Sequence, residues 1–227
     1  MASHDPEYQS GIIAARAAIA ELRALLPESI RQADLTSHSR LPLKVQSARE
    51  LSAYRSLDLA ESACLLFEAG RAIAAIIVAR ASLESVAWLI TLSCRVRAAT
   101  DAPSLNTIED RTHRLLFGTR AIPGMADSLN VLTVVDEACD EYPEFRRLYD
   151  YFSESTHPAA LGTVLSYARL RETDQRQVFD AAVQLRVGRK YPAILRLALQ
   201  MGHLAYGELE TALPTLAALC DSLHDSA

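Results

Sequence analysis

Apolar residues recur along this chain at helical spacing, and polar or proline-containing breaks divide them into successive helices. The first predicted helix begins at Asp5-Pro6, an N-cap followed by a proline suited to a first helical turn, and ends at Pro27. The polar stretch from Glu28 to Leu41 predicts a linker. We therefore predict an N-terminal helix and linker, residues 1–41, that can detach from the remainder.

Two long apolar segments follow the linker and are separated by a single glycine. The pattern predicts one helix over Leu43–Ala69 and a second over Arg71 to about Ala98. Gly70 between them suits a left-handed C-cap, because glycine has no Cβ to oppose that conformation. We expect an antiparallel helix hairpin at the centre of the core.

The rest of the chain continues the helical pattern in shorter segments. Helices are predicted over Ser104–Gly118, Asp127–Ala138, Pro143–Ser155, Asp174–Val187 and Pro192–His224, the last bent at Pro214. The composition is 50% hydrophobic but only 6% aromatic, and alternating strand patterns are scarce, so little or no sheet is expected. The predicted fold class is all-α, a helical bundle built around the central hairpin, with residues 1–227 forming a single domain.

Net charge narrows the choice of partners. The chain of 227 residues carries a formal charge of -5, so charge does not favour nucleic acid as a partner. The most apolar segment, Ala72 to Ile90, contains Arg80 and Glu84 within about one turn, which predicts a buried helix and no membrane partner.

Cysteines, histidines and glycines predict neither a metal nor a cofactor. The four cysteines, Cys64, Cys94, Cys139 and Cys220, are far apart and indicate free thiols in a reducing cytoplasm. The six histidines form no metal-binding pattern, and the eight glycines form no phosphate-binding or dinucleotide-binding motif. We therefore expect no metal, no cofactor and a cytoplasmic location.

Two charged residues interrupt the apolar stripe of the second long helix. Arg80 and Glu84 are four residues apart, so both face the same side as Ile73, Ile77 and Thr91. Buried charges need partners, and such a pair retains donors and acceptors for a third group. The structural alternative is an ion pair that fixes the register of the helix.

A polar stripe lies at the end of the predicted helix Pro143–Ser155. Tyr149, Ser153 and His157 follow one another at intervals of four, just before Pro158. A serine and a histidine at this spacing are candidates for a nucleophile and its base, although no GxSxG motif accompanies them. The structural alternative is a cluster that caps the helix end.

Together the two motifs predict one internal polar cluster. We expect Arg80, Glu84, Ser153 and His157 to converge there, as candidate catalytic residues if the protein is an enzyme, which the sequence leaves open. The candidate ligand-binding residues are Tyr149, Ser153 and His157. The predicted function is a structural, ligand-binding or interaction module.

The two motifs resemble those of a group of uncharacterised bacterial all-helical proteins. The shared pattern is an Arg-x-x-x-Glu helix, here Arg80 to Glu84, followed by Tyr-x-x-x-Ser-x-x-x-His-Pro, here Tyr149 to Pro158. The resemblance covers roughly Leu51 to Leu204 and implies no established activity.

The chain is also loosely similar to the HEPN superfamily of helical bundles. That similarity implies a ribonuclease or a toxin or defence protein, acting as a homodimer on RNA through an arginine and a histidine separated by four to six residues. His157 lacks such an arginine, whereas Arg31 with His38 and Arg196 with His203 have the spacing. Arg196 and His203 share one face of the last predicted helix and are the alternative catalytic pair.

Overall fold

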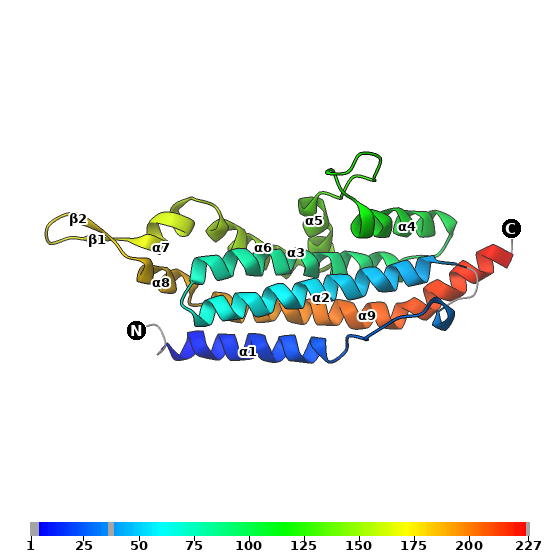
Figure 1. Ribbon diagram of the computed structural model, residues 1–227, viewed down its shortest axis with the longest axis horizontal. Coiled ribbons are helices and arrows are strands. Elements are labelled where there is room, and N and C mark those ends of the chain that lie inside the picture. Colours follow the sequence, from blue (N-terminus) through cyan, green and yellow to red (C-terminus); the bar gives the residue numbers. More distant parts are fainter. Residues whose placement is uncertain (1–4, 36–38, 226–227) are drawn as a thin grey trace. The chain divides into compact units, whose positions relative to one another are not determined.

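A computed structural model describes residues 5–35 and 39–225 of the chain (Figure 1). Within these residues the α-helices are α1 Pro6–Arg23, α2 Leu41–Glu68, α3 Ala72–Arg97, α4 Ala102–Phe117, α5 Val131–Glu141, α6 Pro143–Thr156, α7 Leu165–Tyr167, α8 Gln184–Gly188 and α9 Tyr191–Asp225. Three short segments, η2 Gln32–Asp34, η3 Ala160–Val164 and η4 Ala181–Val183, are 3-10 or π turns. Two strands, β1 Ala168–Arg171 and β2 Arg176–Phe179, form a hairpin. The all-α helical bundle predicted from the sequence is confirmed.

The described chain divides into two compact units. The first consists of Met1–Ala24, Arg55–Leu83 and Pro143–Gln200, and the second of Leu25–Tyr54, Glu84–Tyr142 and Met201–Ala227. Helices α2, α3 and α9 each contribute one part to each unit. The single domain expected from the sequence stays a prediction.

The turn between α2 and α3 has the geometry expected from its glycine. Gly70 has a φ of 71°, its N–H donates to Phe67 O at 3.0 Å, and the N–H of Arg71 donates to Leu66 O at 2.8 Å. These two bonds satisfy carbonyls that the end of α2 would otherwise leave free. Ser56 on α2 and Ser82 on α3 are also hydrogen-bonded at 3.0 Å, which confirms the predicted antiparallel hairpin.

Helix α1 buries its apolar face within the first unit. Tyr8, Ile12 and Leu22 are almost fully buried, and the Tyr8 hydroxyl donates to Phe67 O at 2.8 Å. Arg16 forms an ion pair with Glu68 at 2.8 Å. Removing α1 from α2 would expose this face to water, which opposes detachment.

In the second unit, the shorter helices begin at capping side chains. Asp101 and Ser104 form a capping box at the start of α4, and the Asn130 side chain accepts from the N–H of Leu132 at the start of α5. The Thr91 hydroxyl of α3 donates to Val134 O of α5 at 3.2 Å. Caps and packing together fix both helices.

The predicted helix over Asp174–Val187 is wrong in its first half. β1 and β2 pair antiparallel, with Ala168 opposite Phe179 and Arg171 opposite Arg176, and Asp174 lies in the loop between them. Apolar and polar residues alternate along β1, Ala168-Arg169-Leu170-Arg171, which is the period of a strand rather than of a helix. Helix α8 begins only at Gln184.

Helix α3 is long and apolar enough, by length and composition alone, to cross a membrane. Of its most apolar window, 61% is buried inside the protein, as in the core helix of a globular fold. Ile77, which the helical spacing placed on the buried stripe, is 50% exposed. The apolar surface of α3 therefore extends beyond the side that packs.

Buried phenols and thiols make the stability of the fold sensitive to alkali. Burial raises the pKa of Tyr8 and Tyr206 above the ordinary phenol value, and that of Tyr191 to about 12. It also raises the pKa of the Cys64 and Cys94 thiols to about 11. Above about pH 9 the unfolded chain therefore releases protons that the folded chain retains, and the free energy of unfolding should fall.

We expect this loss to begin near pH 9 and to steepen as the pH rises through 11. Urea denaturation between pH 7 and pH 11 under reducing conditions measures it. A Cys64→Ala variant should show a shallower decline between pH 9 and pH 11, because it lacks one buried thiol. A free energy of unfolding that stays constant up to pH 11 would contradict the prediction.

Candidate functional site

Arg80 of the predicted cluster contacts Tyr149 of the predicted polar stripe in the first unit. Arg80 Nη2 donates to Tyr149 Oη at 2.8 Å, and the guanidinium carbon lies 5.2 Å from the centre of the Tyr149 ring. Arg80 Nη1 also lies 3.5 Å from Thr156 Oγ1, at the limit of a hydrogen bond. The contact joins α3 to α6 through one half-buried cation.

The remaining members of the predicted cluster lie in different surroundings. Ser153 Oγ is buried and has no hydrogen-bond partner among the described residues, whereas the His157 side chain is exposed. Helix α6 ends at Thr156, so His157 lies in the turn beyond it. Glu84 is half-buried and belongs to the second unit. The structure thus brings Arg80 to Tyr149 and leaves His157 at the surface.

The end of α6 is closely packed by backbone and hydroxyl groups. Ser155 Oγ and Tyr191 Oη are hydrogen-bonded at 2.5 Å. A Cβ placed on Gly162 would lie 2.8 Å from Ser155 O and 2.1 Å from His157 O, so only glycine fits there. This agrees with the structural alternative for the polar stripe, a cluster that anchors the end of the helix.

The alternative catalytic pair lies on α9. Arg196 and His203 are both half-buried, and they belong to the first and the second unit respectively. The other pair with the ribonuclease spacing includes His38, which lies outside the described residues. The ribonuclease hypothesis stays a prediction.

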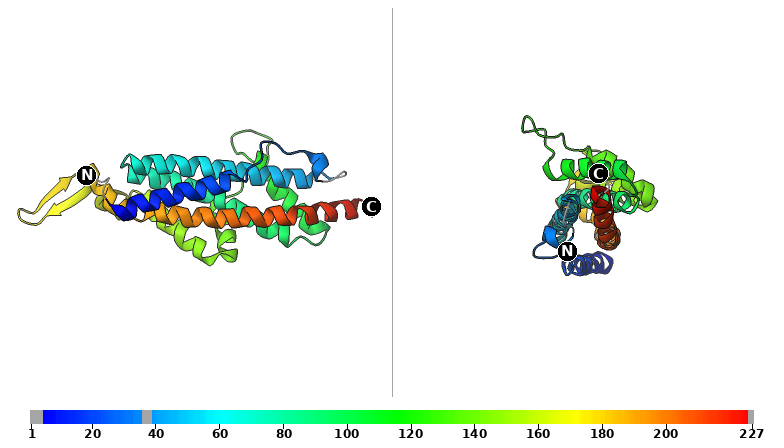
Figure 2. Two further views of the ribbon diagram at one scale, coloured as in Figure 1. Left: turned by 90° about the horizontal axis from the view of Figure 1, so that it is seen from below. Right: turned by 90° about the vertical axis from the view of Figure 1, so that its right-hand side faces the viewer.

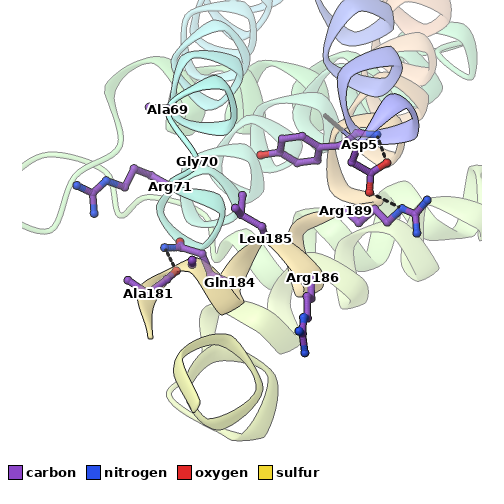
Figure 3. Close-up of a pocket in the computed structure, with 11 residues that line it drawn as sticks. Asp5, Ala69, Gly70, Arg71, Ala181, Gln184, Leu185, Arg186 and Arg189 are labelled. Carbon is purple, nitrogen blue, oxygen red and sulfur yellow. Dashed lines mark hydrogen bonds and ion pairs between the residues drawn. The ribbon is translucent and has the colours of Figure 1, made fainter. Parts of the chain in front are cut away.

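A cavity of about 710 Å³ lies in the first unit, beside the turn between α2 and α3 (Figure 3). Its walls come from the start of α1, from that turn, and from the segment leading into α8. The lining residues are Asp5, Tyr8, Ala69, Gly70, Arg71, Ala181, Ala182, Gln184, Leu185, Arg186 and Arg189. The candidate residues Tyr149, Ser153 and His157 are not among them. Segments far apart in sequence thus form a hollow large enough for a small molecule.

Hydrogen bonds hold the inner wall of this cavity in place. The Gln184 side chain is almost fully buried, and its Oε1 accepts from the N–H of Ile73 at 3.1 Å, in the first turn of α3. Its Nε2 donates to Ala181 O at 2.8 Å. Gln184 therefore caps α3 from a helix 111 residues away in sequence and fixes the cavity wall.

Arginines dominate the rim of the cavity. Arg189 forms ion pairs with Asp5 at 2.9 Å and Glu7 at 3.0 Å, so its charge is balanced within the protein. Arg71 and Arg186 are exposed and form no ion pair with any described residue. In Figure 3 the two side chains extend away from each other at the rim. The cavity therefore has two cationic groups free to turn toward a ligand, in a chain of net negative charge.

A buried ionic network in the second unit was not predicted from the sequence. Arg49 is only 2% exposed, and its Nε donates to Glu50 Oε1 at 2.8 Å. The Tyr206 hydroxyl donates to Glu50 Oε2 at 2.9 Å, and the Arg49 guanidinium lies 4.4 Å from the centre of the Tyr206 ring. Glu210 also pairs with Arg49. The adjacent Arg49-Glu50 pair is one of several charged positions along α2, so the sequence does not mark it as buried.

No metal centre is formed by the residues that the structure describes: they contain no group of three or more histidine, cysteine, aspartate or glutamate side chains close enough to bind an ion. All four cysteines are free thiols. Comparisons with protein-family models, with curated proteins and with solved structures found no match.

Proposed function

We propose that this protein is a helical binding module whose cavity in the first unit takes a small amphipathic anion. The ligand has an apolar body and one carboxylate or phosphate group. The observation that carries the proposal is a cavity with an apolar wall and two arginines at its rim that pair with no acidic side chain among the residues described. The Arg80–Tyr149 contact then has a structural role, joining α3 to α6.

The wall of the cavity suits an apolar body. Ala69, Ala181, Ala182 and Leu185 contribute small or branched aliphatic surface. Gly70 leaves the turn open, because even a Cβ placed on it would come no closer than 3.9 Å to Leu185. Burying aliphatic surface here supplies about 25 cal/mol for each Å² removed from water. The wall alone would bind neutral and anionic molecules equally.

The rim supplies the preference for an anion. Guanidinium groups bind carboxylates and phosphates through paired N–H donors, and the exposed Arg71 and Arg186 side chains can rotate at little cost. The Gln184 side chain in the wall carries no charge, and its two bonds to the backbone hold it in place. Charge recognition therefore depends on the two arginines.

An NMR titration with octanoate, octanol and inorganic phosphate tests the proposal. Octanoate should shift the backbone amides of Gly70 and Leu185 and bind with a dissociation constant of about a millimolar, as expected for ten heavy atoms. Octanol, which lacks the charge, and phosphate, which lacks the apolar body, should each bind about tenfold more weakly.

Variants separate this site from unspecific binding. Arg71→Ala and Arg186→Ala should each weaken octanoate about fivefold, the loss of roughly 1 kcal/mol of a charge-assisted contact. The control is Arg55→Ala, an exposed arginine of the first unit that does not line the cavity. Equal affinity of wild type and the Arg71→Ala, Arg186→Ala double variant would overturn the proposal, as would equal binding of octanol and octanoate.

A further inference from the structure

The β1–β2 hairpin projects from the helices of the first unit and has two chemically distinct faces (Figures 1 and 2). The register places Ala168, Leu170, Gln177 and Phe179 on one face and Arg169, Arg171, Arg176 and Val178 on the other. Leu170 is 60% exposed and Phe179 is 76% exposed. A two-stranded hairpin is marginally stable on its own, and an exposed strand edge is a template for further pairing.

The free edge of β2 can be identified from the hydrogen-bond pattern. The N–H of Asp180 donates to Tyr167 O at 2.8 Å, so Asp180 faces β1. Backbone groups alternate along an antiparallel strand, and Val178 and Arg176 therefore also face β1. Gln177 and Phe179 direct their N–H and C=O groups away from β1, toward an edge where no other strand of the described residues pairs.

We propose that β2 pairs with β2 of a second copy of this chain about a two-fold axis at Val178, forming a four-stranded antiparallel sheet. In this register Gln177 lies opposite the second copy's Phe179, and their outward-facing backbone groups bond to each other. Val178 lies opposite itself. Arg176, whose Nε also lies 3.4 Å from Asp174 Oδ2 within its own hairpin, is opposite Asp180 of the second copy, and this cross-axis pair occurs twice because of the symmetry.

The charged side chains favour pairing of the two copies through β2 over pairing through β1. Asp180 has extended backbone, with φ -153° and ψ 116°, so it continues the face that carries Arg176. Pairing through β2 therefore sets opposite charges across the axis. Pairing through β1 in its equivalent register would centre on Arg169 and set two guanidinium groups directly opposite each other, which is unfavourable. The β2 edge is self-complementary and the β1 edge is not.

The interface is small, so the dimer should be weak. Each favourable cross-strand pair contributes roughly 0.2–1 kcal/mol, and the two Phe179 rings lie in diagonal positions within reach of each other. A few residues a side bury far less than the roughly 1,200 Å² of a stable interface. We expect a concentration-dependent dimer with a dissociation constant of about 10 µM to 1 mM.

Sedimentation of the full chain over a concentration series tests the pairing. Arg176→Asp and Asp180→Arg should each raise the dissociation constant at least tenfold, because each variant sets like charges across the axis. An equimolar mixture of the two variants should dimerise again, since every cross-axis pair is then opposite in charge. The double variant R176D/D180R should also dimerise, and it controls for the loss of the Asp180 side-chain bond to the N–H of Ala182.

A proline at position 177 tests the backbone contact separately. Gln177→Pro removes an outward-facing N–H without removing a bond between β1 and β2, and it should abolish the dimer. Gln177→Thr retains that N–H, so this variant should still dimerise. The proposal is overturned if the wild type stays monomeric up to millimolar concentration, or if its dimer survives both the charge reversals and the proline.

Discussion

Replacing Arg49 by alanine should lower the free energy of unfolding by about 3–5 kcal/mol, because it leaves the Glu50 carboxylate buried without its cation. Arg49 and Glu50 are 2% and 7% exposed, so water cannot replace the lost bonds. The packing of the guanidinium on the Tyr206 ring is lost as well. Urea denaturation followed by circular dichroism measures the change.

Arg16→Ala is the matched control for this prediction. Arg16 also pairs with a glutamate, Glu68, but both side chains are more than a third exposed, so the loss should be only about 0.2–1 kcal/mol. A double variant, Arg49→Met with Glu50→Leu, should recover much of the stability by removing both charges together. If Arg49→Ala lowers the free energy of unfolding no more than Arg16→Ala does, the Arg49–Glu50 pair is not shielded from water.

Phe152→Ala should lower the free energy of unfolding by about 3–5 kcal/mol, because it leaves a cavity in the first unit. The Phe152 ring is fully buried and meets the Tyr191 ring edge to face, with 5.0 Å between the ring centres. Tyr191 in turn bonds Ser155, so the loss also loosens the end of α6. Thermal unfolding and urea denaturation at pH 7 measure the effect.

The comparison with Phe117→Ala shows whether burial is the cause. The Phe117 side chain is 48% exposed at the end of α4, so its removal leaves no enclosed cavity and should cost less than about 1 kcal/mol. Similar losses at the two positions would contradict the packing described for α6 and α9.

Helices with strong apolar periodicity were predictable from the sequence. Gly70 identified the turn between α2 and α3, and Asp5-Pro6 identified the start of α1, because a positive φ and a helix cap each need particular residues. Local chemistry of this kind depends on neighbours in the chain. The hairpin was missed because its strands are four residues long, and one polar loop, Glu172 to Gln175, resembles the start of a helix.

The candidate site was predictable only in part. Arg80 was expected to meet the polar stripe of Tyr149, Ser153 and His157 because helical spacing placed both on packed faces, and in the structure it bonds Tyr149. The helix was predicted to end at Ser155, but its spacing was carried on to His157, which was therefore expected inside the cluster; α6 ends at Thr156 and the His157 side chain is exposed. The cavity depends on the hydrogen bond between Gln184 and Ile73 and on the ion pair between Arg189 and Asp5. Both join segments far apart in sequence, so no local pattern predicts them.

The segments of each unit alternate along the chain, and this has a consequence for biosynthesis. The first unit needs residues up to Gln200 and the second needs residues beyond Met201, so neither has all its segments until most of the chain has left the ribosome. Helix α3, the apolar helix of the bundle, emerges long before α9. Chains that expose apolar surface while incomplete are prone to aggregate. The nascent protein therefore depends on reaching its C-terminal helix before α3 meets another chain.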